Sequence, residues 1–136
     1  KMNQEVIEVQ IKLEEEIANL DPQDKKDFLE LEGIEEPALN KIINKGYEIL
    51  GLDTFFTAGP NELRAWTLKR GSLAPQAAGR IHTDFERGFI KAEIISFEDY
   101  ISFGGEAGSK ENGKLRLEGK DYIFKDGDIA HFKFNV

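Results

Sequence analysis

The sequence of 136 residues contains no cysteine, which excludes disulfide bonds and thiolate metal sites. It also lacks any run of ~18 apolar residues, the length that a membrane-spanning helix needs. No apolar stretch typical of a signal peptide lies near Lys1. Because disulfide bonds are typical of oxidising compartments and this chain can form none, we expect a protein of the reducing cytoplasm. Without a spanning helix or a signal peptide, we also expect no membrane contact.

Positive charge is scarce as well. The chain holds 26 acidic and 18 basic residues, which gives a net charge of −8. Residues 1–52 carry −7 of this charge, and residues 53–136 carry only −1. Because affinity for phosphate comes from counterions that Lys and Arg displace, a chain this acidic is a poor general binder of nucleic acid. Any RNA contact therefore needs a local basic face on residues 53–136.

The apolar residues that are present, 40% of the chain with ten Phe, can fill a core. In the first part, the β-branched run at 6–11 predicts a short strand, and helical spacing predicts helices over 13–20, 22–31 and 37–50. Asp21 is a predicted N-cap with Pro22 at the first helical position. We expect the apolar positions of the last two helices to be packing surfaces: Phe28, Leu29 and Leu31, then Leu39, Ile42, Ile43, Tyr47 and Leu50.

Near Leu52 the apolar period changes from that of helices to that of strands. Strands are predicted at 54–58 and 63–68 around a turn at 59–61, and later at 89–97, 114–117, 122–124 and 129–136. Helices are predicted at 74–79, after a cap at Thr83, and for one turn at 98–101, and residues 104–113 are a predicted flexible loop. This order predicts an α+β fold, with a sheet wrapped around one main helix.

One motif suggests a phosphate-binding loop. Residues 108–114, Gly-Ser-Lys-Glu-Asn-Gly-Lys, fit the pattern G-x-x-x-x-G-K. A working loop needs Ser or Thr next, to hold magnesium, and a helix that points its N-terminus at the phosphates. Here Leu115 comes next and a predicted strand follows, so we interpret the motif as a chance match.

A second group could form a metal or acid–base site: His82, Asp84 and Glu86, with His131 elsewhere in the chain. His82 and Glu86 would share one helical face only if the helix ran through Thr83, which conflicts with Thr83 as a cap. We favour a structural role instead. His82 would bond to the backbone at a helix junction, and His131 would lie on a strand face.

Basic residues interleaved with aromatic ones are typical of RNA contact. The alternative is that the aromatic residues form the core and the basic residues are solvated surface. The candidate contact residues surround Trp66, Phe85 and Phe89 in the sequence, and they are Arg64, Lys69, Arg70, Arg80, Arg87 and Lys91. A second basic group consists of Lys110, Lys114, Arg116 and Lys120.

Several segments together resemble the YchF or Obg-like ATPase family of translation-associated P-loop proteins. They are FFTAG at 55–59, ELRAWT at 62–67, APQAAGRIHTDFERGFIKAE at 74–93, GKLRLEGKDY at 113–122, DGD at 126–128 and FKFNV at 132–136. The resemblance covers residues 53–136 without gaps. In that family this region is the TGS domain, a ubiquitin-like β-grasp module. Residues 1–52 resemble the end of the preceding nucleotide-binding domain, a strand followed by helices.

The resemblance implies that the phosphate-binding loop, the magnesium site and the Asn-x-x-Glu motif lie upstream. The base-contacting Ser-Ala-Lys of the family corresponds to residues 10–12, Gln-Ile-Lys, so Lys12 alone remains. We therefore expect the C-terminal part of a longer protein that binds ATP or GTP with magnesium and associates with the ribosome. This part would have no complete nucleotide site, no activity of its own, and a module that contacts ribosome or RNA.

Two other functions stay open at this point. One is a β-grasp adaptor that binds a protein partner and never touches RNA. The other, less favoured, is an enzyme that uses His82, Asp84 and Glu86.

Overall fold

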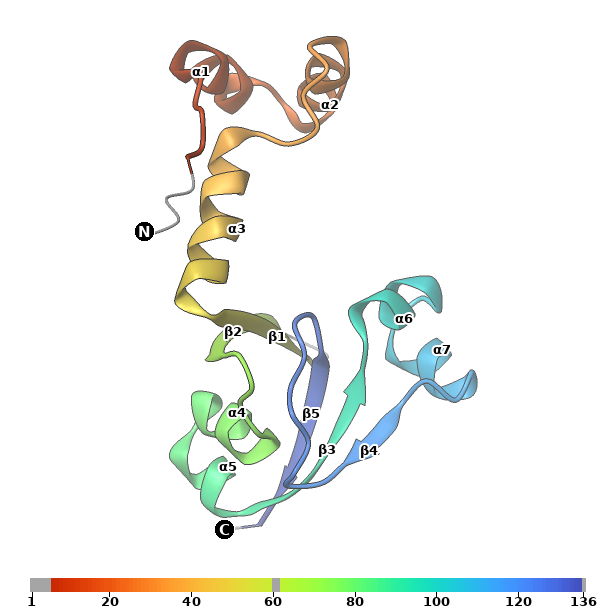
Figure 1. Cartoon of the computed structure of the whole chain (residues 1–136). Coiled ribbons are helices and arrows are strands. Elements are labelled where there is room, and N and C mark those ends of the chain that lie inside the picture. Colours follow the sequence, from red (N-terminus) through yellow and green to blue (C-terminus); the bar gives the residue numbers. More distant parts are fainter. Residues whose placement is uncertain (1–5, 60–61, 136) are drawn as a thin grey trace. The chain divides into compact units, whose positions relative to one another are not determined.

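The structure, a computed structural model, describes residues 6–59 and 62–135 (Figure 1). The chain divides into two compact units, residues 1–50 and residues 51–136. Each unit has its own secondary structure and its own packing, so the two are described separately.

The first unit consists of three helices, α1 (Ile11–Asn19), α2 (Pro22–Leu31) and α3 (Ala38–Leu50). As predicted, the Asp21 side chain caps α2: it accepts hydrogen bonds from the backbone N of Gln23 and of Asp24, both at 3.1 Å. A carboxylate also meets the start of α3, where the Ala38 backbone N donates to Glu14 Oε1 at 2.7 Å. Negative charge at a helix N-terminus is stabilising, so Glu14 fastens α1 to α3.

Two predictions for the first unit are wrong. Residues 6–10 form no strand, and Ile11 already begins α1. Within the described residues 6–50 there is no strand to pair with, so the backbone groups of a β-branched run cannot be satisfied as a sheet. The apolar faces of α2 and α3 are not buried within the unit either. Leu31 is 82% exposed, Phe28 and Leu29 are half-buried, and the predicted stripe of α3 is exposed throughout.

The second unit is a five-stranded sheet in the order β2-β1-β5-β3-β4. The strands are β1 (Leu52–Ala58), β2 (Leu63–Lys69), β3 (Phe89–Ile95), β4 (Arg116–Glu118) and β5 (Ile129–Phe134). Strands β1 and β2 form a hairpin whose register runs from Leu52↔Lys69 to Ala58↔Leu63. The central pair β1 and β5 is parallel, at Phe56↔Ile129, and the other pairs are antiparallel.

Four helices complete this unit: α4 (Ala74–Ile81), α5 (Thr83–Arg87), α6 (Phe97–Ser102) and α7 (Glu106–Glu111). Helix α4 packs on one face of the sheet with α5 beside it, and α6 and α7 follow β3 (Figure 1). The predicted α+β fold is confirmed, with a β-grasp sheet around one main helix.

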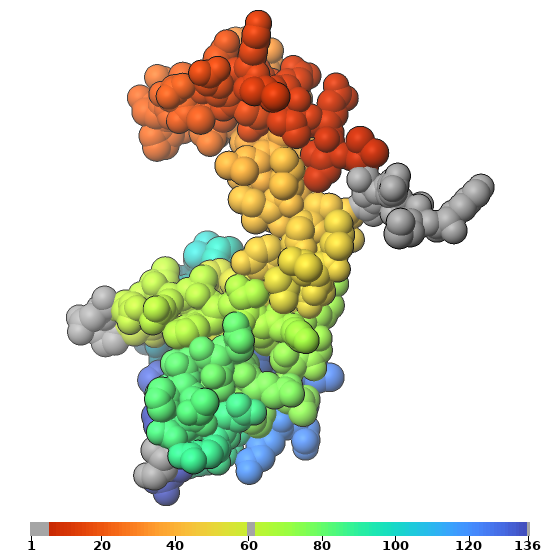
Figure 2. All heavy atoms as spheres, turned by 90° about the vertical axis from the view of Figure 1, so that its left-hand side faces the viewer, coloured from red at the N-terminus to blue at the C-terminus, as the bar shows by residue number. Residues whose placement is uncertain are grey.

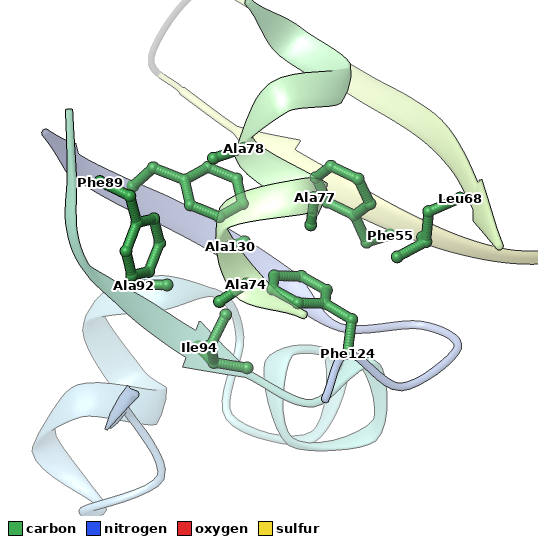
Figure 3. Packing of buried hydrophobic residues seen from close by; sticks show 11 residues of the cluster. Phe55, Leu68, Ala74, Ala77, Ala78, Phe89, Ala92, Ile94, Phe124 and Ala130 are labelled. Carbon is green, nitrogen blue, oxygen red and sulfur yellow. The ribbon is translucent and has the colours of Figure 1, made fainter. Parts of the chain in front are cut away.

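The core of the second unit forms where α4 meets the sheet (Figure 3). The fully buried side chains of the helix are three alanines, Ala74, Ala77 and Ala78, and Ile81 at its end packs against the same core while partly buried. Because the alanine side chains are small, the helix backbone comes close to the phenylalanine rings of the sheet side. The Phe55 ring lies 5.1 Å from that of Phe124, centroid to centroid, with Phe132, 7% exposed, beside both.

Three local predictions for this unit are corrected by the structure. Residues 106–111 form α7 rather than a flexible loop. His82, not Thr83, is the N-cap of α5, and Thr83 is its first residue. Residues 122–124 make a single bridge, Leu73↔Ile123, instead of a strand. In the turn predicted at 59–61, the second and third residues lie outside the described ranges, and so does residue 136 of the closing strand.

A polar network holds the segment between β4 and β5. Asp128 is 2% exposed, and its Oδ2 accepts hydrogen bonds from the Tyr122 hydroxyl at 2.7 Å and from the Lys125 backbone N at 3.0 Å. Arg116 Nη2 lies 3.5 Å from Asp128 Oδ1 and donates to the Tyr122 oxygen at 3.2 Å. Burial, together with the hydrogen bond to Asp128, raises the pKa of Tyr122 to about 12. The phenol therefore stays protonated and keeps donating to Asp128.

Replacing a core ring should destabilise this unit strongly. We expect Phe132→Ala to lower the free energy of unfolding by about 3–5 kcal/mol, because it leaves a cavity between α4 and the sheet. Chemical denaturation measures the change. Phe97→Ala is the matched control, since Phe97 is 47% exposed and should cost much less. Equal losses for the two variants would contradict the assignment of Phe132 to the core.

The Tyr122 network predicts a pH dependence. The folded state holds the phenol proton more tightly than the unfolded chain does. The stabilisation is therefore complete below pH 10 and is lost as the pH rises through about 12. Tyr122→Phe should cost about 1–3 kcal/mol at pH 7 and should weaken the loss of stability between pH 10 and 12.

Denaturation at several pH values, compared with Tyr100→Phe, tests this dependence. If Tyr122→Phe kept the full alkaline loss of the unchanged protein, the network would not control it.

Candidate functional site

The structure does not gather the six candidate basic residues into one face. Arg64 and Lys69 lie on β2, and Arg70 follows directly; Arg80 lies on α4, Arg87 on α5 and Lys91 on β3. Strands β2 and β3 are separated in the sheet by β1 and β5. Closeness in the sequence therefore does not make this group a single patch.

Three of these six side chains already hold the fold together. Arg70 Nε donates to Asp53 Oδ1 at 3.0 Å, and that carboxylate is buried. Arg80 Nε donates to the Thr67 backbone oxygen at 2.8 Å, which ties α4 to β2, an edge strand. Arg87 pairs with Asp84 within α5. These partners leave Arg70, Arg80 and Arg87 less free to bind a ligand.

The other three are better placed for contact. Arg64, Lys69 and Lys91 are exposed. Among the described residues, Lys69 and Lys91 form neither an ion pair nor a side-chain hydrogen bond. Arg64 Nη1 lies 3.8 Å from Glu62 Oε1, too far for a hydrogen bond. Of the predicted set, these three cations thus have the fewest contacts within the fold.

A groove of about 420 Å³ lies beside Arg64. Thr57, Arg64 and Trp66 of the β1–β2 hairpin line one part of it, and Phe85 of α5 and Phe134 of β5 line another. Figure 2 views the second unit from the side on which α4 and α5 lie. The groove opens where β1 and β5 stop pairing, since their register contains only Phe56↔Ile129.

The aromatic residues of the predicted interface divide between the core and this groove. Phe89 is 4% exposed and belongs to the core. Trp66 and Phe85 are half-buried, and both line the groove. The two predicted alternatives, core and contact surface, thus apply to different rings.

His82, Asp84 and Glu86 each make local contacts in the second unit, and His82 Nδ1 lies 3.5 Å from Asp84 Oδ2. His82 Nδ1 accepts a hydrogen bond from the Asp84 backbone N at 3.1 Å, as predicted for a helix junction. Glu86 packs against Gly79, where a Cβ would overlap its carboxylate, and His131 is exposed on β5. Across residues 6–59 and 62–135, no three His, Asp or Glu side chains are placed to share a metal ion.

Contacts within the fold account for three residues of the G-x-x-x-x-G-K match, Gly108, Ser109 and Lys114. Gly108 lies inside α7, where a Cβ would overlap the Phe103 carbonyl oxygen of the preceding segment. The buried Ser109 hydroxyl donates to the backbone oxygen of Gly105 at 2.8 Å. Lys114 pairs with Asp99 at 3.3 Å, and hydrogen bonds from Ser96 and Lys114 lower the pKa of that carboxyl. These residues fasten α7 to α6.

The remaining candidates are scattered. Lys110 and Lys120 are exposed, whereas Arg116 belongs to the Asp128 network. Lys12, the predicted remnant of a nucleotide contact, is the second residue of α1 and is exposed. The helices in the described ranges are all too short or too polar to span a bilayer.

If the motif is structural, its first glycine should matter for stability and not for nucleotide binding. We expect Gly108→Ala to lower the free energy of unfolding by about 1–3 kcal/mol, because the added methyl group forces α7 away from Phe103. Gly119→Ala, where a Cβ meets no atom within 4 Å, is the control. Calorimetry with millimolar Mg-ATP and Mg-GTP should show no saturable heat for the unchanged chain. A saturable signal that Gly108→Ala abolishes would contradict the assignment.

The family model YchF-GTPase_C, described as a protein of unknown function (DUF933), matches residues 52–135. The matched segment corresponds to the second unit from the start of β1 to the residue after β5.

Two curated relatives match along nearly the whole chain. Ribosome-binding ATPase YchF of Haemophilus influenzae is 59% identical over 131 residues, which are 96% of this chain and 36% of the relative. Ribosome-binding ATPase YchF of Bacillus subtilis is 56% identical over 134 residues, 98% of this chain and 37% of the relative. The chain thus spans about a third of the length of these relatives.

A solved structure, the YchF GTPase of Schizosaccharomyces pombe, superposes with a TM-score of 0.82 at 37% identity. The match covers 96% of this chain and 34% of that one. Since the family model covers well over half of the residues and the fold agrees, this chain belongs to the YchF family, and residues 52–135 are the family's C-terminal region.

Proposed function

We propose that this chain is the C-terminal part of a ribosome-binding ATPase of the YchF type, and that residues 51–136 form its TGS module and contact the ribosome. The supporting observation is the extent of the match. Identity of 56–59% to two proteins named ribosome-binding ATPases runs through 96–98% of the chain, so it includes nearly all of the second unit. We place the protein in the cytoplasm, where ribosomes are found.

We assign the nucleotide chemistry to the rest of the parent protein. The chain spans about a third of its relatives, and its one phosphate-loop match is used for packing. ATP or GTP would bind there with Mg²⁺ and be hydrolysed, and Lys12 on α1 would approach the base from this chain. The role of residues 51–136 is then to carry the contact with the ribosome.

Charge limits the form that this contact can take. The chain carries −8 overall, which opposes long-range attraction to ribosomal phosphates. Binding must therefore depend on individual cations at short range. Arg64, Lys69 and Lys91 are the members of the predicted set with the fewest partners, although they lie on different parts of the sheet and form no single patch. The alternative, a protein adaptor, would not need these cations.

The proposal predicts a salt-dependent loss of ribosome binding when the three cations are neutralised. In co-sedimentation with bacterial ribosomes, the variant Arg64→Gln, Lys69→Gln, Lys91→Gln should pellet less than the unchanged chain. The slope of log affinity against log salt should become shallower by about 1 for each phosphate contact removed.

A control variant with the same charge change is Lys110→Gln, Lys120→Gln, Lys125→Gln, at exposed positions on α7 and between β4 and β5. It should pellet like the unchanged chain. If both variants lost binding equally, net charge alone would govern the association. If neither lost binding, the protein-adaptor alternative would gain support.

A further inference from the structure

Three planar groups lie in series between the core of the second unit and the groove: the Phe55 ring, the Trp66 ring and the Arg64 guanidinium. The register places Phe55 opposite Trp66 and Thr57 opposite Arg64, so all four side chains lie on one face of the hairpin. The Phe55 and Trp66 rings are stacked, with centroids 6.5 Å apart and 19° between their planes. The Arg64 guanidinium carbon lies over the Trp66 ring, 4.6 Å from its centroid.

This arrangement is held before any ligand arrives. Trp66 Nε1 donates to Thr57 Oγ1 at 3.0 Å, which fixes the orientation of the indole and satisfies its only donor. The buried Phe55 supports it from the core. Trp66 therefore acts as a rigid base for Arg64 and offers no hydrogen bond of its own to a ligand.

The guanidinium is largely free. The Arg64 side chain is 59% exposed, and its ion pair with Glu62, 3.8 Å from Nη1 to Oε1, is too long for a hydrogen bond. The groove beside it, about 420 Å³, lies within the size range of ligand sites and has Phe85 and Phe134 as further apolar walls. The Phe85 and Phe134 rings are stacked on each other, with centroids 3.7 Å apart. This contact restricts the movement of both rings in the wall of the groove.

We propose that this groove takes one unpaired base of single-stranded RNA, stacked on the Arg64 guanidinium. The inference rests on the ribosome contact proposed above and adds the ligand class and the residue that recognises it. Unpaired bases stack on aromatic rings and on guanidinium planes, whereas bases inside a duplex present no free face. A planar cation between apolar walls matches a flat base attached to an anionic backbone.

Attraction between the Arg64 charge and a phosphate explains this site less well than stacking of a base does. Glu62 lies close to Arg64, so a bare phosphate would meet a carboxylate beside the cation. A stacked base makes its contact with the plane of the guanidinium and the nearby rings instead. Stacking should therefore dominate, and the salt dependence should be shallow, with a slope near −0.7 for a single phosphate contact.

The chain carries its own probe for the test, because Trp66 is the only tryptophan. Titration of the 136-residue chain with an eight-nucleotide oligoadenylate should quench its fluorescence to saturation. Arg64→Lys keeps the charge and removes the plane, and it should weaken binding by between about 5-fold and 100-fold. Lys120→Gln, a change at an exposed residue that does not line the groove, should stay within about twofold.

Two results would overturn the proposal: no saturable quenching by the oligonucleotide, or an Arg64→Lys variant that binds it as tightly as the unchanged chain. Circular dichroism and the denaturation midpoint show whether each variant remains folded. The outcome is separable from that for the ribosome. A chain that pellets with ribosomes without binding the oligonucleotide would keep the proposed function and lose this site, and the reverse would keep this site and lose the proposed function.

Discussion

The close contact between the alanine face of α4 and the phenylalanine rings of the second unit is the constraint on which the rest of that unit depends. Ala74, Ala77 and Ala78 place only methyl groups in the core that they share with the rings of Phe55 and Phe132. A larger residue at any of the three would separate the layers and leave rings without contacts. Because α5 follows α4 after one residue, this packing also fixes Phe85 and thereby one wall of the groove.

The same packing determines which basic side chains remain available to contact a ligand. Arg80 leaves α4 and ties it to an edge strand, and Arg70 closes the base of the hairpin through the buried Asp53. Both residues lie at junctions between elements, where each donates to an oxygen of a neighbouring segment. Arg64 lies farther along the hairpin, beyond these junctions, so its guanidinium rests on Trp66 instead of pairing within the fold. The proposed contact at this surface therefore uses a side chain that the fold does not need to join its layers.

The features that the sequence predicted well are those decided by local pattern. The hairpin, the helix at Ala74 and the closing strand follow from alternation, from Pro75 in the first turn and from small apolar spacing. The errors concern features that depend on distant partners. Residues 6–11 have strand composition, but the described part of the first unit contains no partner strand. Residues 122–124 meet only the short segment 72–74, which gives an isolated bridge at Leu73↔Ile123. The glycine at position 108 is typical of a flexible loop in the sequence. Its real role is the close approach to Phe103, a tertiary contact that local pattern does not show. The groove was also missed, although the interleaving of Arg64 and Trp66 was a signal for part of it.

In the proposed contact with an unpaired base, rigidity and net charge together favour recognition by shape over recognition by charge. A site assembled from a fixed indole, a stacked ring pair and a supported guanidinium loses little conformational freedom when a ligand binds. An acidic chain, in contrast, gains little from long-range attraction to phosphate, so encounter with RNA is not accelerated. Selectivity must then come from the planar contact itself, which a duplex cannot make because its bases are already stacked. A module of this kind would bind exposed, unpaired segments of a large RNA and would not bind the double-helical segments of that RNA.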